Sequence, residues 1–174
     1  HGKMPFLILA LFFSATLACK RQGFVPSPQR VEERDIHTLA TGAKAVDFNL
    51  PDVSGKYFQL SDFDKADILV VIFTCNHCPT AQAYEDRIIQ FTSDYMERGV
   101  SVVAIMPNSP LALLLEECGY SDLDDTYESM IIRAKDKKYN FPYLYDGDVE
   151  AVSIQYGPAS TPHAFVFNKN RELV

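Results

Sequence analysis

The feature that most constrains this sequence is a pair of cysteines, Cys75 and Cys78, placed where an apolar run ends and a helical pattern begins. The run 68–73 (ILVVIF) is typical of a buried strand. After Cys78, four residues recur at steps of four, three and four and predict one face of a helix: Tyr84, Ile88, Phe91 and Tyr95. A thiol in the first turn of such a helix meets unpaired backbone N–H groups and the positive end of the helix dipole, which favour the thiolate. Because the thiolate is the reactive species in thiol–disulfide exchange, the arrangement indicates redox chemistry.

The composition narrows the class of protein. A length of 174 residues supports one domain with appendages, and 47% hydrophobic residues are enough for a core without disulfide staples. Sixteen basic against twenty-three acidic residues give a net charge of −7 with no long basic run, so nucleic acid is not an expected partner. The four cysteines, at positions 19, 75, 78 and 118, are too few and too unevenly spaced for a disulfide scaffold.

Residues 1–19 have the pattern of a targeting segment. Residues 1–3 precede Met4 and are set aside as an upstream remnant, and residues 5–18 carry no charge. Their length suits the hydrophobic part of a signal peptide better than a bilayer-spanning helix. The stretch ends in small residues before Cys19, which resembles a bacterial lipoprotein signal whose cleavage leaves a lipidated cysteine. We therefore expect an exported protein of the periplasm or cell envelope, held to the membrane by a lipid on Cys19 or by an uncleaved signal; a cleaved signal with an incidental Cys19 is the alternative.

The rest of the chain reads as a polar tether, 20–44, followed by one domain, 45–174. Because strand 68–74, helix 78–97 and strand 100–106 form a βαβ unit, these two strands are expected to be parallel and buried. The other expected elements are a hairpin of 47–50 and 56–60, a helix at 126–138 capped by Asp125, a strand at 141–145, a short helix at 149–156, a strand at 163–167 and the start of another at 172–174.

This order of motifs resembles the thioredoxin-like superfamily, and more narrowly the redoxin domains related to alkyl hydroperoxide reductase and thiol-specific antioxidant proteins. The motifs that carry the resemblance are Asp47-Phe-x-Leu50, the sequence FTCNHCP at 73–79, Tyr143-Leu-Tyr-Asp146, Tyr156-Gly157 and Thr161-Pro162-His163. The resemblance covers about 45–174 and implies an α/β three-layer fold, with a central mixed sheet flanked by helices and an N-terminal hairpin. It also implies a cis bond between Thr161 and Pro162, which would face the cysteine pair and present backbone to a substrate chain. It implies no cofactor and no metal.

The sequence departs from that pattern in three places. Thr74 stands where many thioredoxins have Trp, directly before the first cysteine. The run 68–73 has no counterpart of the acidic residue that thioredoxins bury beneath the pair. Finally, the family normally continues through a completed strand and a C-terminal helix, so we expect that strand and helix to be missing by truncation at Val174.

In the predicted site, Cys75 is the attacking nucleophile and Cys78 the resolving thiol. A static disulfide or half of a zinc site is the alternative, but a zinc site needs two further ligands and only scattered residues offer them: Cys118, His37 and His163. His77, with Asn76 between the cysteines, is expected to stabilise the thiolate and to make the couple more oxidising.

Three other residues that could take part in chemistry are expected to have structural or incidental positions instead. His163 is expected to be a strand residue with a satisfied hydrogen bond, and direct contact with the sulfurs is the less favoured reading. Glu85 lies seven residues after Cys78 and is predicted to be an exposed helix charge in preference to a proton relay. Cys118 is predicted to be a free thiol in the long connection 107–124.

We expect a thiol–disulfide oxidoreductase that acts on protein dithiols or disulfides and is recycled by an unidentified redox partner. A peroxiredoxin-like thiol peroxidase is the first alternative. Aligned on Cys78, the Pro-x-x-x-Thr-x-x-Cys pattern of peroxiredoxins meets Val71 and Cys75 in place of Pro and Thr. The second alternative is a non-enzymatic Cu(I) carrier that uses the cysteine pair and His163, although such carriers space their cysteines by three residues.

Overall fold

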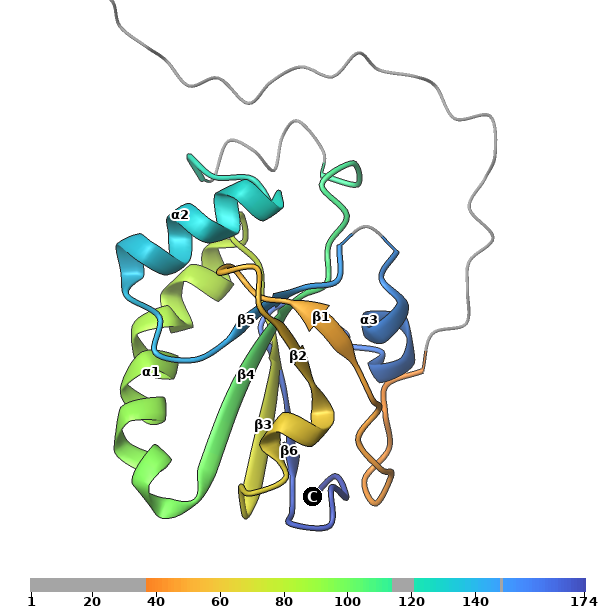
Figure 1. The fold of residues 1–174 in the computed structure, drawn as a ribbon. Coiled ribbons are helices and arrows are strands. Elements are labelled where there is room, and N and C mark those ends of the chain that lie inside the picture. The colour runs from red at the N-terminus through yellow and green to blue at the C-terminus, as the bar shows by residue number, and fades with distance from the viewer. Residues whose placement is uncertain (1–36, 114–120, 148) are drawn as a thin grey trace, which may run out of the picture.

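Figure 1 shows a computed structural model of the protein, which describes residues 37–113, 121–147 and 149–174. A four-stranded sheet lies in the middle, with α1 (Pro79–Tyr95) and α2 (Tyr127–Lys137) on one face and α3 (Ala151–Tyr156) on the other. The strand order is β5 (Tyr143–Tyr145), β4 (Val100–Met106), β3 (Ile68–Phe73) and β6 (His163–Phe167). The three-layer α/β fold with a central mixed sheet is therefore confirmed.

Strand β3 occupies an inner position in the sheet. It runs parallel to β4, with Ile68 opposite Val100, and antiparallel to β6, with Leu69 opposite Phe167. Strand β4 in turn pairs in parallel with β5. Because β3 is covered on both faces, its continuous apolar sequence is the pattern expected of a buried parallel strand. The predicted βαβ unit is confirmed.

Alternate residues of β3 contribute to two separate cores. Leu69, Val71 and Phe73 face the layer that holds α3, where they pack with Tyr156 and Phe165. Val70 and Ile72 face the layer of α1 and α2, and the same core contains the following residues: Cys75, Ala81, Met130 and Tyr143. The first cysteine of the motif is thus part of the hydrophobic core.

The N-terminal hairpin is present as β1 (Asn49–Pro51) and β2 (Tyr57–Gln59), followed by the 3-10 turn η1 (Leu60–Phe63). Its turn is joined to the edge of the main sheet by a bridge between Asp52 and Leu144. The hydroxyl of Tyr127 donates a hydrogen bond to the Asp52 carbonyl, so the hairpin also contacts α2. The hairpin therefore holds the start of α2 against the sheet.

Helix α1 is confirmed, but the aromatic face that revealed it does not pack on the sheet. Tyr84, Phe91 and Tyr95 are exposed, and the Phe91 and Tyr95 rings stack on each other with centroids 4.7 Å apart. The buried positions of the helix are Ala81, Glu85 and Thr92. The helix continues as the 3-10 turn η2 (Met96–Arg98) and is ended by Gly99, whose positive φ of 78° suits a residue without a side chain.

Helix α2 begins one residue later than predicted. Its N-cap is Thr126, whose hydroxyl accepts a hydrogen bond from the Ser129 N–H at 3.2 Å. Asp125 is therefore not the cap, and its side chain points elsewhere in the molecule. The reason is that Thr126 can satisfy the helix terminus by itself, which leaves the preceding carboxylate available for another use.

Near the C-terminus, Glu172 and Leu173 form single bridges with Lys44 and Phe167 in place of an extended strand. Residues just before the hairpin are docked as well, since the Leu39 N–H donates to the Tyr156 carbonyl at 2.9 Å. In the described ranges, no helix has the length and apolar character needed to span a bilayer. The predicted signal segment 5–18, Cys19 and Cys118 lie outside the described residues.

Candidate active site

The cysteine motif forms the loop between β3 and α1, and its two thiols lie in different environments. Cys75 follows the end of the strand and is 2% exposed. Cys78 is the N-cap residue of α1, with Pro79 in the first helical position, and is partly exposed. Both cysteines are free thiols in this structure.

Thr161 and Pro162 face this pair across the end of the sheet, and their peptide bond is cis, as expected. The Cys75 sulfur lies 3.0 Å from the Thr161 hydroxyl. The Cys78 thiol donates to the Thr161 carbonyl at 3.5 Å. The loop that ends in Thr161 therefore contacts both sulfurs.

The two thiols differ in acidity, and the difference is opposite to the expected one. Burial, followed by the negative charge of Asp125, raises the pKa of Cys75 from its ordinary 9.0 to about 12. Partial burial acts in the same direction on Cys78, but the backbone N–H groups of Ala81 and Thr80 outweigh it and lower the pKa of that thiol. Formation of the thiolate is thus easier at Cys78 than at Cys75, because Cys78 lies at the start of the helix and Cys75 lies in the core.

Asp125 supplies the buried acid that the sequence seemed to lack. Its side chain is completely buried, and Oδ1 accepts hydrogen bonds from the backbone N–H groups of Asn76, at 2.8 Å, and His77, at 3.2 Å. Oδ2 accepts from the His77 ring at 2.7 Å and from the Asn108 side-chain amide at 2.7 Å. The acid reaches the site from the segment before α2 and not along β3.

This contact fixes the tautomer of His77. Because an ionised carboxylate can only accept hydrogen bonds, Nδ1 of His77 carries the hydrogen in this pair. Nε2 is then the basic nitrogen of the ring. The imidazole is mostly buried, with 15% of its side chain exposed. His77 therefore stands between the buried acid and solvent.

Asn76 holds the motif in place and is itself completely buried. Its side-chain amide donates to the Asp124 carbonyl at 2.8 Å, and its side-chain oxygen accepts from the Tyr143 hydroxyl at 3.2 Å. Its backbone carbonyl accepts from Gln82 at 2.8 Å and from Arg133 at 3.3 Å. The predicted association of Asn76 with the site thus takes the form of a scaffold that fixes the loop between the two thiols.

Among the described residues, one group of potential metal ligands comes together: Cys75, His77 and Asp125, with ligand atoms within 4.8 Å of one another. The hydrogen bonds that the Asp125 oxygens accept already account for this arrangement. His163 is not a member of the group. Its Nδ1 accepts from the Ala159 N–H at 3.1 Å and its ring stacks on Phe165, in agreement with the predicted strand position with a satisfied hydrogen bond.

The prediction for Glu85 is wrong, because this residue is buried and not an exposed charge. It is 2% exposed, and Arg133 Nε lies 2.8 Å from its Oε1. Lys137 Nζ lies 3.3 Å from Oε2, and the Tyr139 hydroxyl donates to Oε1 at 2.9 Å. These partners offset the cost of burying the carboxylate and join α1 to α2.

Sequence reasoning missed Asp125 as a site residue. The one local signal was the order Asp124-Asp125-Thr126 before a helix, which offers three capping residues where one is needed. The pattern does not say which of the surplus carboxylates turns inward.

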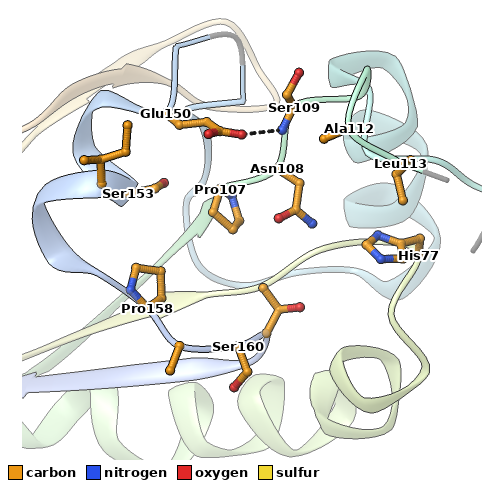
Figure 2. A pocket seen from close by; sticks show the side chains of 13 residues that line it. His77, Pro107, Asn108, Ser109, Ala112, Leu113, Glu150, Ser153, Pro158 and Ser160 are labelled. Carbon is orange, nitrogen blue, oxygen red and sulfur yellow. Dashed lines mark hydrogen bonds between the residues drawn. The ribbon is translucent and has the colours of Figure 1, made fainter. Parts of the chain in front are cut away.

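An open cleft of about 410 Å³ lies beside the motif. His77 and Asn108 line one part of it, and Ser160 and Thr161 from the loop before β6 line another. Figure 2 shows Glu150 across the cleft, where its carboxylate accepts a hydrogen bond from the Ser109 N–H at 3.0 Å. Neither cysteine lines the cleft, but Thr161 lines it and contacts both sulfurs.

A mixed sheet, two cysteines at a strand–helix junction and a facing cis-proline loop define a thioredoxin-like redox protein. The model of the AhpC/TSA family matches residues 41–174. The chain therefore belongs to the AhpC/TSA family. No curated protein is a significant match to the chain.

Solved structures of similar proteins agree with this assignment. A hypothetical protein from Sinorhizobium meliloti is 34% identical with a TM-score of 0.70, and the match covers 79% of this chain and 70% of that one. The thioredoxin domain of a thiol-disulfide oxidoreductase from Bacteroides vulgatus is 17% identical with a TM-score of 0.63, covering 79% and 87%. Peroxidoxin BcpB from Mycobacterium tuberculosis is 20% identical with a TM-score of 0.61, covering 79% and 83%. The last two similarities show the fold.

Proposed function

We propose that the protein is a thiol–disulfide oxidoreductase in which Cys78 attacks and Cys75 resolves. The observation that carries this proposal is the opposed environment of the two thiols. Cys78 caps a helix at the surface, whereas Cys75 is buried beside a carboxylate. An attacking thiol must be accessible and ionised, and a resolving thiol must be held back until a mixed disulfide has formed.

In the reducing direction, the Cys78 thiolate attacks one sulfur of a substrate disulfide. A bond forms between Cys78 and that sulfur, and the second substrate sulfur leaves as a thiolate. Cys75 then loses its proton and attacks the Cys78 sulfur, which closes the Cys75–Cys78 disulfide and releases the first substrate sulfur. Two electrons pass from the protein dithiol to the substrate, and a redox partner is needed to restore the dithiol. The oxidising direction is the reverse of these steps.

The second step needs a proton acceptor close to Cys75, because burial opposes formation of its thiolate. Asp125 and His77 fill this requirement in our proposal, since one carboxylate oxygen of Asp125 and one ring nitrogen of His77 lie within 4.8 Å of the Cys75 sulfur. The imidazole of His77 takes the proton while Asp125 stabilises the resulting imidazolium. The leaving thiolate of the substrate receives the proton when the reaction is complete.

A trapping experiment tests the order of the two cysteines. In a background with Cys19 and Cys118 replaced by serine, the reduced protein is mixed with the neutral disulfide 4,4′-dithiodipyridine. Cys75→Ser should react at Cys78 and keep a stable mixed disulfide, seen by mass spectrometry, whereas the intact pair should close its own disulfide and release two thiopyridone equivalents. Cys78→Ser should react on the order of a hundredfold more slowly at pH 7, because a thiol with a pKa of about 12 is almost fully protonated there.

The reverse outcome, a fast Cys78→Ser protein and an unreactive Cys75→Ser protein, would restore the order expected from the sequence. If both variants and the protein with both cysteines all reacted slowly, the proposed exchange activity itself would be refuted.

Thiol peroxidase activity is the second candidate, supported by membership of the AhpC/TSA family and by the lowered pKa of the Cys78 thiol at the start of α1. No lysine or arginine is among the described residues that line the cleft, although a cation beside the thiol would assist peroxide cleavage. We therefore rank exchange above peroxide reduction. Turnover of hydrogen peroxide faster than reduction of insulin disulfides would reverse this order.

We also propose a cell-envelope location, supported by the uncharged stretch 5–18 before Cys19. Mass spectrometry of the membrane-extracted protein should show an acylated N-terminal Cys19. A mature N-terminus elsewhere, without the modification, would refute the lipid anchor.

A further inference from the structure

The cleft beside the cysteine motif carries one carboxylate whose charge is not paired with a lysine or arginine of the described residues. Among the described residues that line it, Glu150 is the one carboxylate and His77 is the one basic residue. Glu150 Oε1 accepts the hydrogen bond of the Ser109 N–H, and Oε2 accepts none from the described residues. Within the same residues, no lysine or arginine lies within 4 Å of the Glu150 carboxylate. Its negative charge is therefore available to a bound molecule.

Two buried carboxylates lie directly behind the walls of the cleft. Asp146 is 3% exposed and accepts hydrogen bonds at 2.7 Å from the backbone N–H and the hydroxyl of Ser153, which lines the cleft. Its other oxygen, Oδ1, is buried and has no hydrogen-bond partner in the described part of the chain. On the opposite side, Asp125 lies behind His77. Both charges add to the negative potential of the cleft, since protein walls screen charge less than water does.

We propose that this cleft selects polypeptide substrates whose reacting cysteine is flanked by lysine or arginine, and that Glu150 is the residue that provides the selection. This inference rests on the proposed exchange activity. A cationic side chain next to the substrate sulfur meets the free oxygen of Glu150, whereas an acidic side chain is repelled by it. Acidic small thiols such as glutathione, which carry net negative charge, are poor partners by the same reasoning.

The variant Glu150→Gln tests the charge of this side chain separately from its position. The amide oxygen of glutamine can still accept the hydrogen bond from the Ser109 N–H, so the position of the side chain is retained while its charge is removed. Glu97→Gln is the matched control, because Glu97 is an exposed residue of η2, at the end of α1 that lies away from the cysteines.

The test uses two disulfide-bonded peptides that are identical except for lysine or glutamate on both sides of each cysteine. Second-order rate constants for their reduction by the full-length reduced protein are measured at about 20 mM and about 500 mM salt. The wild type should reduce the lysine peptide about fivefold faster than the glutamate peptide at low salt. Glu150→Gln should lower this ratio to about twofold or less, Glu97→Gln should leave it unchanged, and high salt should reduce it in the wild type.

Equal rates for the two peptides in the wild type would overturn the inference and leave the exchange activity intact. A ratio that survives Glu150→Gln would also overturn it, because the selection would then come from another part of the surface. Failure to reduce either peptide, with an intact dithiol, would refute the proposed function and this inference with it.

Discussion

Asp125 is a single residue that acts on three parts of the site. Its carboxylate fixes the backbone of the motif through the N–H groups of Asn76 and His77, and it fixes the ring of His77. Its charge also raises the pKa of Cys75, after burial, which is the larger cause. One carboxylate therefore adds to the effect of burial on the pKa of Cys75 and also holds the imidazole that we propose as the proton acceptor of this thiol.

Asp125→Asn should consequently have two opposed effects. Removal of the charge lowers the pKa of Cys75 from about 12, while the His77 ring loses the carboxylate that orients it. We expect the alkylation rate of Cys75, measured against pH in a Cys78→Ser background, to rise at lower pH than with Asp125 present. With Cys78 present, closure of the intramolecular disulfide at pH 7 should slow by about tenfold or more.

Glu128→Gln is the control, because Glu128 is exposed in the first turn of α2 and loses the same charge. If this variant shifted the Cys75 profile as far as Asp125→Asn does, the effect would be a general one of charge and not a property of the buried acid.

The sequence was sufficient to predict the residues of the site that are recognised by local context. Cys75 and Cys78 follow a strand and precede a helix, and Thr161-Pro162 directly precedes another strand. Asp125 was beyond such reasoning, because it lies 48 residues from its nearest partner in the motif, His77, and only the tertiary fold joins them. The environments of the two thiols could not be predicted in this way, since they depend on which cysteine lies at the start of the helix and which enters the core.

At the scale of the elements, α1 and α2 are joined by a buried ion cluster as well as by apolar packing. Glu85 on α1 meets Arg133 and Lys137 on α2, and Arg133 also donates to the Asn76 carbonyl in the motif. The cluster therefore connects the packing of the helices with the position of the cysteine loop. The helices were predictable from their periodicity, but their packing faces were not, because a buried glutamate and exposed aromatic rings reverse the usual hydrophobic pattern.

Glu85→Ala should be strongly destabilising. It removes the acid and leaves Arg133 partly buried without its partner, for which a loss of about 3–5 kcal/mol in the free energy of unfolding is typical. Urea denaturation followed by circular dichroism measures this loss. Asp86→Ala is the control, since Asp86 is 84% exposed and its pair with Lys137 should contribute less than about 1 kcal/mol. Similar losses of unfolding free energy for the two variants would show that the buried cluster stabilises the protein no more than an exposed ion pair does.

At the scale of the whole molecule, several acids are buried in their protonated form. Burial raises the pKa values of Tyr143 and Tyr156, and it raises that of Cys75 to about 12. Above the ordinary pKa of each group, the unfolded chain holds fewer protons than the folded protein. The free energy of unfolding must therefore fall as the pH rises beyond about 9.

Urea unfolding at pH 7.5, 9, 10 and 11 should show this decline. Each of the three groups should contribute up to about 1.4 kcal/mol for every pH unit above its ordinary pKa, until its raised pKa is reached. Tyr156→Phe removes one of the groups and should make the decline less steep above pH 10. A decline of unchanged steepness in that variant would contradict the assignment.

The acid that faces Cys75 enters the site on the segment before α2, whereas the thiols lie on the loop between β3 and α1. The two thiols and the carboxylate that raises the pKa of Cys75 thus belong to separate segments of the chain. A graft of residues 121–137 into a relative would transfer the control of the buried thiol while leaving the recipient's cysteine motif untouched. The same separation means that a change before α2 can alter the acidity of Cys75 without any change in the cysteine motif itself.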